Sequence, residues 1–422
     1  MSQTNRTTDR YLSQAEIYDI IDSGTPQELY QNKRLLVLTP DATRTCPLPM
    51  MIRALNAIVG KEAAKLDFMV ALGTHTPLSQ TQIFELYGMT EKERQTEFKK
   101  SEFFNHRWDL GGTSRQIGVL TEKEIAALSD HRLKESVPIE INKKIFDYDQ
   151  IMVLGPVFPH EVVGFSGGAK YFFPGISGGE FLHFFHWLGA VVTCANTIGV
   201  KSTPMRQALD LAMQKISVPV HLLAMVVANK EKLYGLFPGD IKKAWSKAAD
   251  LSASCHVITK DKPFQTVLGC APLMYDELWT AGKVMYKLEQ VVADGGRLII
   301  YGPHITEISR TWGSLIEEVG YHVRDYFLLQ MDKFKHIPRG VLAHSTHVRG
   351  SGTFADGKET GRIDVILATS ISPTNCQKIN LGYLNPDEIK LENYKEKEST
   401  GILLVEHAGE ILHKITDNPN LL

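Results

Sequence analysis

The sequence lacks long hydrophobic runs and paired cysteines. Its longest apolar stretch, around His221–Ala228, has the length of a strand, whereas a membrane-spanning helix needs about 20 apolar residues. The first ten residues, MSQTNRTTDR, are polar and have no apolar core of the kind found in secretory signals. The five cysteines are scattered without a CxxC pair, which is typical of reduced thiols. We therefore expect a cytoplasmic protein with no membrane partner.

The sequence also lacks a surplus of positive charge. Its 46 Lys and Arg residues and 48 Asp and Glu residues give a net charge of -2, and the pI is about 6.7. Binding to a nucleic-acid polymer requires a concentrated basic face, so we expect no nucleic-acid partner. A chain of 422 residues with 43% hydrophobic residues can bury a sizeable core.

Short apolar runs alternate with helical patterns along the chain. Strands are predicted at Arg34–Thr39, Asp67–Leu72, Gln150–Leu154, Val220–Ala228, Arg297–Tyr301, Ile363–Ala368 and Gly401–Val405. Helices are predicted at Met50–Val59, Gln80–Tyr87 with Ser79 as its N-cap, Met205–Met213 and Leu278–Ala293. Continuous Val, Ile, Leu and Met runs are typical of parallel strands covered on both faces. The alternation predicts a doubly wound α/β fold.

A domain boundary is predicted in the region Ala253–Asp276, before a new unit of helix, glycines and strand begins. It divides the chain into residues 1–265, an α/β domain for catalysis and cofactor binding, and residues 266–422, a second α/β domain whose last residues could pack back on the first. We expect two Rossmann-like domains with the active site in the cleft between them.

The segment Gly155–Gly179, GPVFPHEVVGFSGGAKYFFPGISGG, directly follows a predicted buried strand. It contains seven glycines together with His160 and Lys170. Glycine lets the backbone approach a ligand closely, because it has no Cβ and tolerates positive φ. Most loops of this composition are structural, but a His and a Lys on either side of Ser166-Gly167-Gly168 favour a binding site.

Two other polar loops follow predicted strands, at Asp41–Arg44 and around His75. Ligands of open α/β sheets bind at the carboxyl ends of the strands, so these loops and His160 are expected to share a cleft. Two imidazoles there are suited to act as an acid/base pair. Arg44 can grip a carboxylate or phosphate, and Asp41 can orient a histidine. An Asp turn beside an exposed Arg fits the Asp41–Arg44 motif equally well.

Several basic side chains leave alternatives open. Lys170 can be a nucleophile, a covalent anchor or a point charge for phosphate. His183 and His186 share one helix face, as a metal site would use, although the aromatic residues around them fit a core helix. No other His or Cys cluster supplies further metal ligands. Lys283 alone is typical of a solvated helix lysine, and it matters only if two domains close over one cleft.

In their order along the chain, these motifs resemble the lactate racemase family. They are DATR (Asp41–Arg44), ALGTHTPLS (Ala71–Ser79), Asn105-His106, PHEVVGFSGGAK with PGISG (Pro159–Gly178), the helix with His186, and AGK (Ala281–Lys283). The resemblance implies a nickel-pincer nucleotide as cofactor, joined covalently to Lys170, with Ser166, Gly167 and Gly168 as further cofactor-binding residues. It also implies His186 as the nickel ligand and cofactor-biosynthesis proteins as partners.

The same resemblance implies a racemase or epimerase that inverts C2 of a 2-hydroxy acid by hydride transfer to and from the cofactor. The catalytic residues that it implies are His75, His160, Asp41, Arg44 and Lys283. The two histidines would be the bases, because the hydroxyl lies on opposite sides in the two stereoisomers. Trp279 and Thr280 stand where we expect Tyr and Gln in enzymes acting on lactate. The substrate is therefore expected to be another 2-hydroxy acid, such as malate, an aromatic hydroxy acid or a sugar acid.

Three other functions would each require different sequence features. An NAD-dependent 2-hydroxy acid dehydrogenase would need a GxGxxG turn between a strand and a helix, and we find none. A phosphate- or nucleotide-binding hydrolase would use Ser166 and Lys170 and would depend on magnesium rather than nickel. A non-catalytic homologue would be favoured by loss of the bases, and both His75 and His160 are present.

Overall fold

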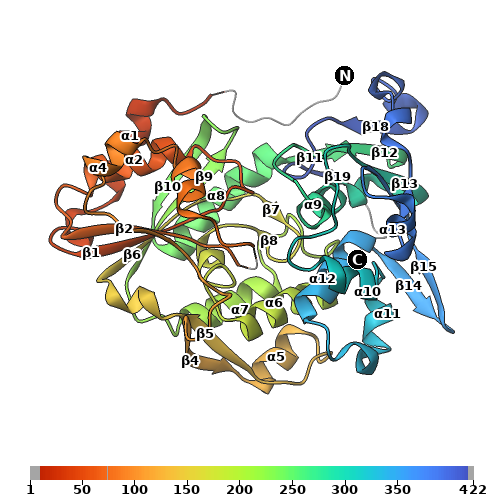
Figure 1. The fold of residues 1–422 in the computed structure, drawn as a ribbon, viewed down its shortest axis with the longest axis horizontal. Helices are drawn as coiled ribbons and strands as arrows, with labels where there is room; N and C mark the ends of the chain where they lie inside the picture. Colours follow the sequence, from red (N-terminus) through yellow and green to blue (C-terminus); the bar gives the residue numbers. More distant parts are fainter. Residues whose placement is uncertain (1–9, 74, 417–422) are drawn as a thin grey trace.

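Two separate sheets, both mainly parallel, organise an α/β fold in the computed structural model, which describes residues 10–73 and 75–416 (Figure 1). The first sheet has the strand order β10 (Leu233–Gly239), β9 (Val220–Val227), β6 (Gln150–Pro156), β1 (Arg34–Thr39), β2 (Lys65–Val70) and β3 (Phe103–Asn105). Only the pair β10–β9 is antiparallel among these strands. The predicted mixed α/β class is confirmed.

The first sheet is buried on both faces. Along β1, Leu35 and Val37 pack into one apolar cluster while Leu36 and Leu38 pack into another, as the alternation of side chains in a strand requires. The helices of this half are α1 (Gln14–Gly24), α2 (Leu48–Ile58), α3 (Gln80–Leu86), α4 (Glu91–Gln95), α5 (Glu122–Leu128), α6 (Gly179–Val192), α7 (Pro204–Met213) and α8 (Ile241–His256). Helices α1 and α2 cover one face, and α6 and α7 lie on the other (Figure 1).

The order of the strands places a crevice beside β1. From β1 the chain adds β2 and β3 on one side, whereas β6 and β9 extend the sheet on the other side. The order therefore reverses between β1 and β6, and the loops that leave their carboxyl ends diverge there. Asp41 follows β1 and His160 follows β6, so the topology alone brings these two residues to one edge of the sheet.

The second sheet is wholly parallel. Its order is β17 (Gly382–Tyr383), β16 (Asp364–Thr369), β13 (Val292–Gly302), β12 (Phe264–Cys270) and β18 (Ile402–Val405). Its helices are α9 (Leu278–Leu288), α10 (Gly313–Val319), α11 (Arg324–Leu328), α12 (Arg339–Arg349) and α13 (Pro373–Lys378). One apolar cluster runs from α6 of the first half through α9 to this sheet.

Four short pairs of strands complete the fold. They are β4–β5 (Ser114–Leu120 with Val137–Asn142), β7–β8 (Pro159–His160 with Gly164–Phe165), β14–β15 (Gly352–Ala355 with Lys358–Gly361) and the parallel pair β11–β19 (Val257–Lys260 with Leu412–Ile415). Strand β12 begins at Phe264, before the predicted boundary at residues 265 and 266, and the division into two domains stays a prediction. The prediction that the last residues of the chain pack on the first domain also concerns residues 417–422, which lie outside the described residues.

Most predicted elements are present, with shifted ends. Ser79 caps α3 through a capping box with Gln82, as predicted. The helix predicted at Leu278–Ala293 is too long, since α9 ends at Leu288 and β13 already begins at Val292. β-Branched Val291 and Val292, followed by Gly295 at φ +70°, favour an extended chain over a continued helix.

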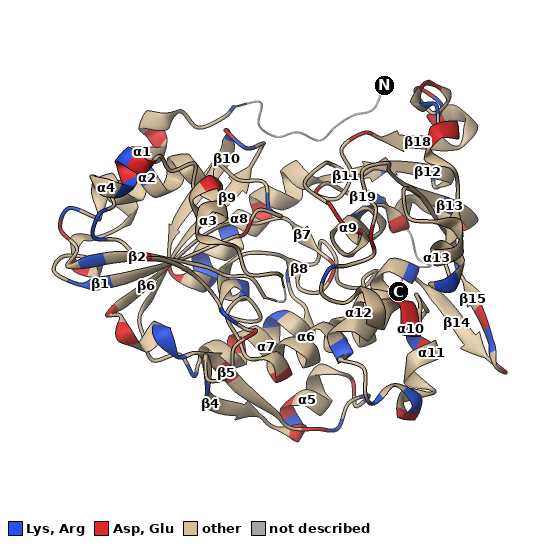
Figure 2. Ribbon diagram, in the orientation of Figure 1, with Lys and Arg blue, Asp and Glu red and all other residues tan. Residues whose placement is uncertain are grey.

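The charges of the described residues are mixed in sign along the ribbon (Figure 2). Lys, Arg, Asp and Glu alternate over the outer helices of both halves rather than separating into an acidic and a basic side. Every helix within residues 10–73 and 75–416 is too short or too polar to span a bilayer.

Candidate active site

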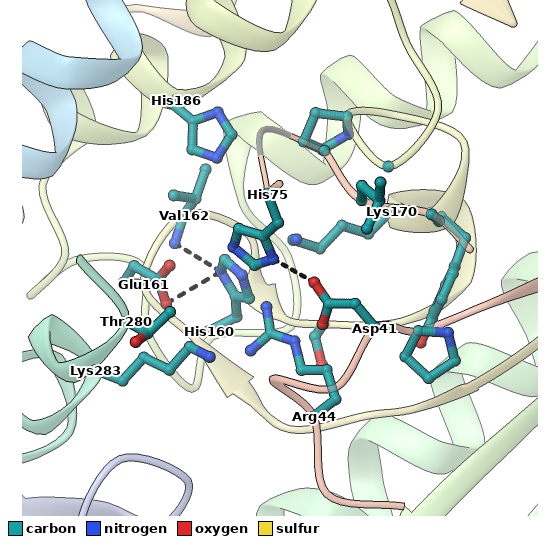
Figure 3. A pocket seen from close by; sticks show the side chains of 18 of the residues that line it. Asp41, Arg44, His75, His160, Glu161, Val162, Lys170, His186, Thr280 and Lys283 are labelled. Carbon is teal, nitrogen blue, oxygen red and sulfur yellow. Dashed lines mark hydrogen bonds and ion pairs between the residues drawn. The ribbon is translucent and has the colours of Figure 1, made fainter. Parts of the chain in front are cut away.

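One pocket collects the loops at the carboxyl ends of β1, β2 and β6 together with α9 and α12 (Figure 3). Of the predicted site residues, its wall contains Asp41, Arg44, His75, His160, Ser166, Gly167, Lys170, His186 and Lys283. Gly168 is the exception, because it faces the ring of Trp245 instead. The two candidate bases therefore share one cavity, and Lys283 meets them there although it belongs to the other half of the chain.

His75 is held by the loop after β1. Its Nδ1 hydrogen-bonds Asp41 Oδ2, while the other oxygen of Asp41 accepts from the Thr43 amide (3.0 Å) and hydroxyl (2.7 Å). Burial alone would raise the pKa of Asp41, but the neighbouring charge and hydrogen bond of His75, with Arg44, hold it well below its usual range. An ionised carboxylate can only accept, so Nδ1 of His75 carries the proton and Nε2 offers a lone pair.

His160 has a different arrangement. Its Nδ1 accepts a hydrogen bond from the Val162 amide at 3.1 Å, so the proton of the neutral ring is on Nε2. The carboxylate oxygen Oε2 of Glu161 also lies 3.3 Å from this Nδ1 (Figure 3). Burial, with the nearby charges of Lys170 and Arg44, lowers the pKa of His160 well below its ordinary value.

The two imidazoles are thus complementary in the resting state. His75 presents a free lone pair and His160 presents an N–H, and both line the same pocket. One ring is ready to accept a proton and the other is ready to donate a hydrogen bond to an oxygen.

Three cationic groups face one another across the pocket. Burial is the main cause that lowers the pKa of Lys170 to about 7, and the charge of Arg44 adds to it. The same two causes lower the pKa of Lys283 to about 7, although its Nζ donates to the Thr43 carbonyl at 3.2 Å. Such a cluster is suited to a negatively charged ligand, which would relieve the repulsion.

The lowered pKa values predict unusual amine reactivity. In cofactor-free protein, reductive methylation at pH 7.5 should modify Lys170 and Lys283 far faster than the exposed Lys242, because about three quarters of an amine with a pKa of 7 is neutral there. Lowering the pH to 6 should suppress both reactions. Peptide mapping by mass spectrometry measures the rates, and equal rates at all three lysines would contradict the assignment.

His186 offers one nitrogen to the pocket. Its Nδ1 donates to the Leu182 carbonyl at 2.8 Å, which leaves the Nε2 lone pair free. Burial lowers its pKa to about 4, so the ring is neutral, as a metal ligand must be. His183 does not join it, since that ring packs edge-on against Trp312. Among the described residues, no three His, Cys, Asp or Glu side chains cluster to hold a metal.

The glycine-rich segment is buried rather than a surface loop. From Gly155 to Gly178 only Glu161 and Lys170 are partly exposed. Gly167 and Gly168 have φ of +79° and +60°, and a Cβ on Gly167 would lie 2.8 Å from the Val157 side chain. The Ser166 hydroxyl donates to the Pro156 carbonyl (3.2 Å) and accepts from the Phe158 amide (2.9 Å). Ser166 therefore fixes the turn that presents Lys170.

Comparisons with known proteins identify the domain in the first half of the chain. Residues 11–198 match the lactate racemase N-terminal domain. The lactate racemase of Thermoanaerobacterium thermosaccharolyticum is 24% identical over 293 residues, and that of Lactiplantibacillus plantarum is 21% identical over 306 residues. The chain therefore contains a lactate racemase N-terminal domain, and it resembles lactate racemases over about two thirds of its length. The two alignments cover 65% and 70% of this chain, respectively. They cover only 61% and 66% of the length of the two relatives.

Two solved structures share the fold of this chain over nearly its whole length. The lactate racemase apoprotein of T. thermosaccharolyticum shares the fold with a TM-score of 0.72 and 19% identity, covering 98% of this chain and 96% of that one. A crystal structure of a Thermotoga maritima protein gives a TM-score of 0.88 with 30% identity and covers 96% of this chain and 99% of that one.

The lactate racemase family motifs do not account for the whole pocket. Glu161, Tyr286, His344 and His347 also line it, and sequence reasoning gave none of them a role. Glu161 is adjacent to His160 in the motif, but the sequence does not reveal where its carboxylate points. The spacing of His344 and His347 in AHSTH, three residues apart, was the available signal for the pair on α12.

Proposed function

We propose that this chain is a racemase or epimerase that inverts C2 of a 2-hydroxy acid. The observation that carries the proposal is the pair of imidazoles, His75 and His160, in one pocket with three cationic side chains. A 2-hydroxy acid has a carboxylate for the cations and a hydroxyl for the imidazoles. Its two stereoisomers present that hydroxyl in opposite directions, which calls for an acid/base group on each side.

The pocket residues fit a nickel-pincer nucleotide. Lys170 offers an amine with a pKa of about 7 and no competing ion pair in the described part of the chain, as a covalent anchor requires. His186 offers a neutral Nε2 for nickel. When bound, this cofactor supplies the acceptor for the C2 hydride and returns it, with a planar 2-keto acid in between.

Arg44 and Lys283 are proposed to hold the carboxylate of the substrate. Arg44 has a planar fork that suits a carboxylate, and Lys283 is fixed from the other half of the chain by its bond to the Thr43 carbonyl. Anchoring the carboxylate at two points keeps C2 in place while its hydroxyl is exchanged between the two sides.

His75 and His160 are proposed to move the hydroxyl proton. His75 accepts it at Nε2, and Asp41 stabilises the imidazolium that results. On the other side, His160 donates from Nε2. To act as the acid, His160 first takes up a second proton from solvent at Nδ1, in place of the hydrogen bond from the Val162 amide and 3.3 Å from Glu161. The ring then releases its Nε2 proton and ends neutral, while His75 returns the proton that it accepted to solvent. In the reverse direction the two rings exchange roles.

The hydrolase alternative finds less support. Ser166 would have to be a nucleophile, but its hydroxyl already donates to one backbone group and accepts from another. No histidine is hydrogen-bonded to it in the described residues, so it lacks the base that activates a serine.

The proposal predicts nickel-dependent inversion of a 2-hydroxy acid. Protein produced together with the cofactor-biosynthesis proteins should contain nickel and convert one enantiopure 2-hydroxy acid into its C2 stereoisomer, as followed by chiral chromatography. Protein produced without them should be inactive. Nickel-loaded protein that leaves every member of a panel of lactate, malate, aromatic hydroxy acids and aldonates unchanged would contradict the proposed function.

A further inference from the structure

The turn before Lys170 is bound by two side chains that the proposed chemistry does not use. The first is Arg206 of α7, which is 7% exposed. Its guanidinium donates from Nη2 to the Phe165 carbonyl and from Nη1 to the Gly167 carbonyl at 3.4 Å. The Gly167 carbonyl also accepts from the amide of Lys170 at 3.3 Å. One acceptor therefore links Arg206 to the backbone of Lys170.

The second side chain is Trp245 of α8, which is 5% exposed. Its Nε1 donates to the Ser166 carbonyl at 2.8 Å, so three successive carbonyl groups of the turn are held. The guanidinium carbon of Arg206 lies 3.9 Å from the centre of the Trp245 ring. A Cβ on Gly168 would lie 3.1 Å from atoms of the same side chain. The indole thus contacts both the guanidinium and the turn.

The positive charge of Arg206 has no carboxylate directly beside it in the described part of the chain. Asp210, one turn further along α7, pairs instead with the exposed Lys242 at 2.6 Å. The Nε of Arg206 also lacks a hydrogen-bond partner within residues 10–73 and 75–416. Burial lowers the pKa of Arg206 to about 9, and the guanidinium stays charged at neutral pH. A buried charge without a direct counter-ion is costly, which favours a role beyond packing.

This charge acts on the amine of Lys170. Burial and the charges of Arg44 and Arg206 lower the pKa of Lys170. The carboxylates of Glu161 and Asp41 oppose them. A fixed turn and a fixed positive charge together keep the amine out of bulk water and mostly neutral.

Building on the function proposed above, we propose that Arg206 and Trp245 are positioning residues for Lys170. They hold the turn so that the amine stays in the pocket, and the charge of Arg206 favours the neutral amine that cofactor attachment requires. Among the described residues, the pocket wall contains Ser166 and Gly167 but neither Arg206 nor Trp245. Their effect therefore reaches the pocket through the turn and through the charge.

The test measures the reactivity of the Lys170 amine in cofactor-free protein. Arg206→Gln should slow reductive methylation of Lys170 at pH 7.5 by about threefold or more. A rise in pKa from about 7 to about 8 reduces the neutral fraction of the amine from about three quarters to about one quarter. Arg206→Lys keeps a charge but not the planar fork, and its rate should fall in between. Lys283 is the internal control, because Arg206 is not among the main causes of its lowered pKa.

Trp245→Phe tests the same arrangement without removing a charge, and it remains available if Arg206→Gln does not fold. It keeps a ring beside Arg206 and loses the N–H that binds the Ser166 carbonyl. Methylation of Lys170 should slow about twofold or more, because a looser turn lets the amine reach water and keep its proton. Arg132→Gln, at an exposed arginine, should change neither rate. Equal changes at Lys170 and Lys283, or no change at Lys170, would overturn the proposal.

Cofactor attachment gives a second readout. In protein produced with the cofactor-biosynthesis proteins, the fraction of chains with added mass should fall about threefold or more in Arg206→Gln and stay at the wild-type value in Arg132→Gln. An undiminished fraction in Arg206→Gln would overturn the role in attachment. Wild-type protein that acquires no added mass would instead contradict the proposed cofactor, while the methylation rates would still decide whether Arg206 and Trp245 position Lys170.

Discussion

Cofactor-loaded protein carrying His75→Ala is expected to interconvert its substrate about 10²- to 10⁴-fold more slowly than wild type, and the same loss is expected for His160→Ala. Each substitution removes the group that is proposed to accept or donate the hydroxyl proton on one side of C2. The equilibrium between the two stereoisomers does not depend on the enzyme. Loss of one base must therefore reduce kcat/KM equally in both directions, which chiral chromatography from either pure isomer measures.

The control for this experiment is His336→Ala, because His336 is exposed and pairs with Glu318 outside the pocket. Circular dichroism and nickel content should match wild type in all three variants. If either pocket variant retains normal rates in both directions, the scheme with two bases is wrong.

Lys170→Arg is expected to abolish both cofactor attachment and activity. Arginine keeps the positive charge, but its guanidinium stays protonated and cannot serve as the amine nucleophile. Lysine at this position has its pKa lowered to about 7 by burial and Arg44. In protein produced with the cofactor-biosynthesis proteins, intact mass spectrometry should show an added mass on wild type and none on the variant.

Two other lysines provide matched controls. Lys283→Arg should keep the added mass while losing substrate affinity, because Lys283 is proposed to bind substrate rather than cofactor. Lys242→Arg, at an exposed lysine paired with Asp210, should change neither mass nor rate. Added mass that persists in Lys170→Arg would show that the attachment is at another residue.

The sequence was informative wherever local pattern and topology act together. Arg34–Thr39 is continuous apolar sequence, and it forms β1 with the predicted ends because both of its faces are covered. Parallel strands end at one edge of a sheet, so placing His75 and His160 at strand ends was enough to predict that they meet. The meeting of Lys283 with them followed only from the family resemblance.

Features that depend on packing between distant segments were not predictable in this way. Nothing local in the glycine-rich segment indicates that it is buried, since this results from the packing of Trp245 and Arg206 against it. The carboxylate of Glu161 lies beside His160 Nδ1 only because the β7–β8 hairpin turns there. His344 and His347 reach the pocket because α12 packs on α6 and α9, about 160 residues further along the chain from His186.

The division of the pocket wall between two parts of the chain has an evolutionary consequence. The loops with His75, His160 and Lys170 lie within residues 11–198, whereas Trp279 and His347 come from beyond that range. Mutations in α9 and α12 can thus alter which molecule is accepted while the reaction centre stays intact. Related chains can therefore act on different substrates while retaining the same chemistry. A likeness confined to the first half of such a chain indicates the type of reaction better than it indicates the substrate.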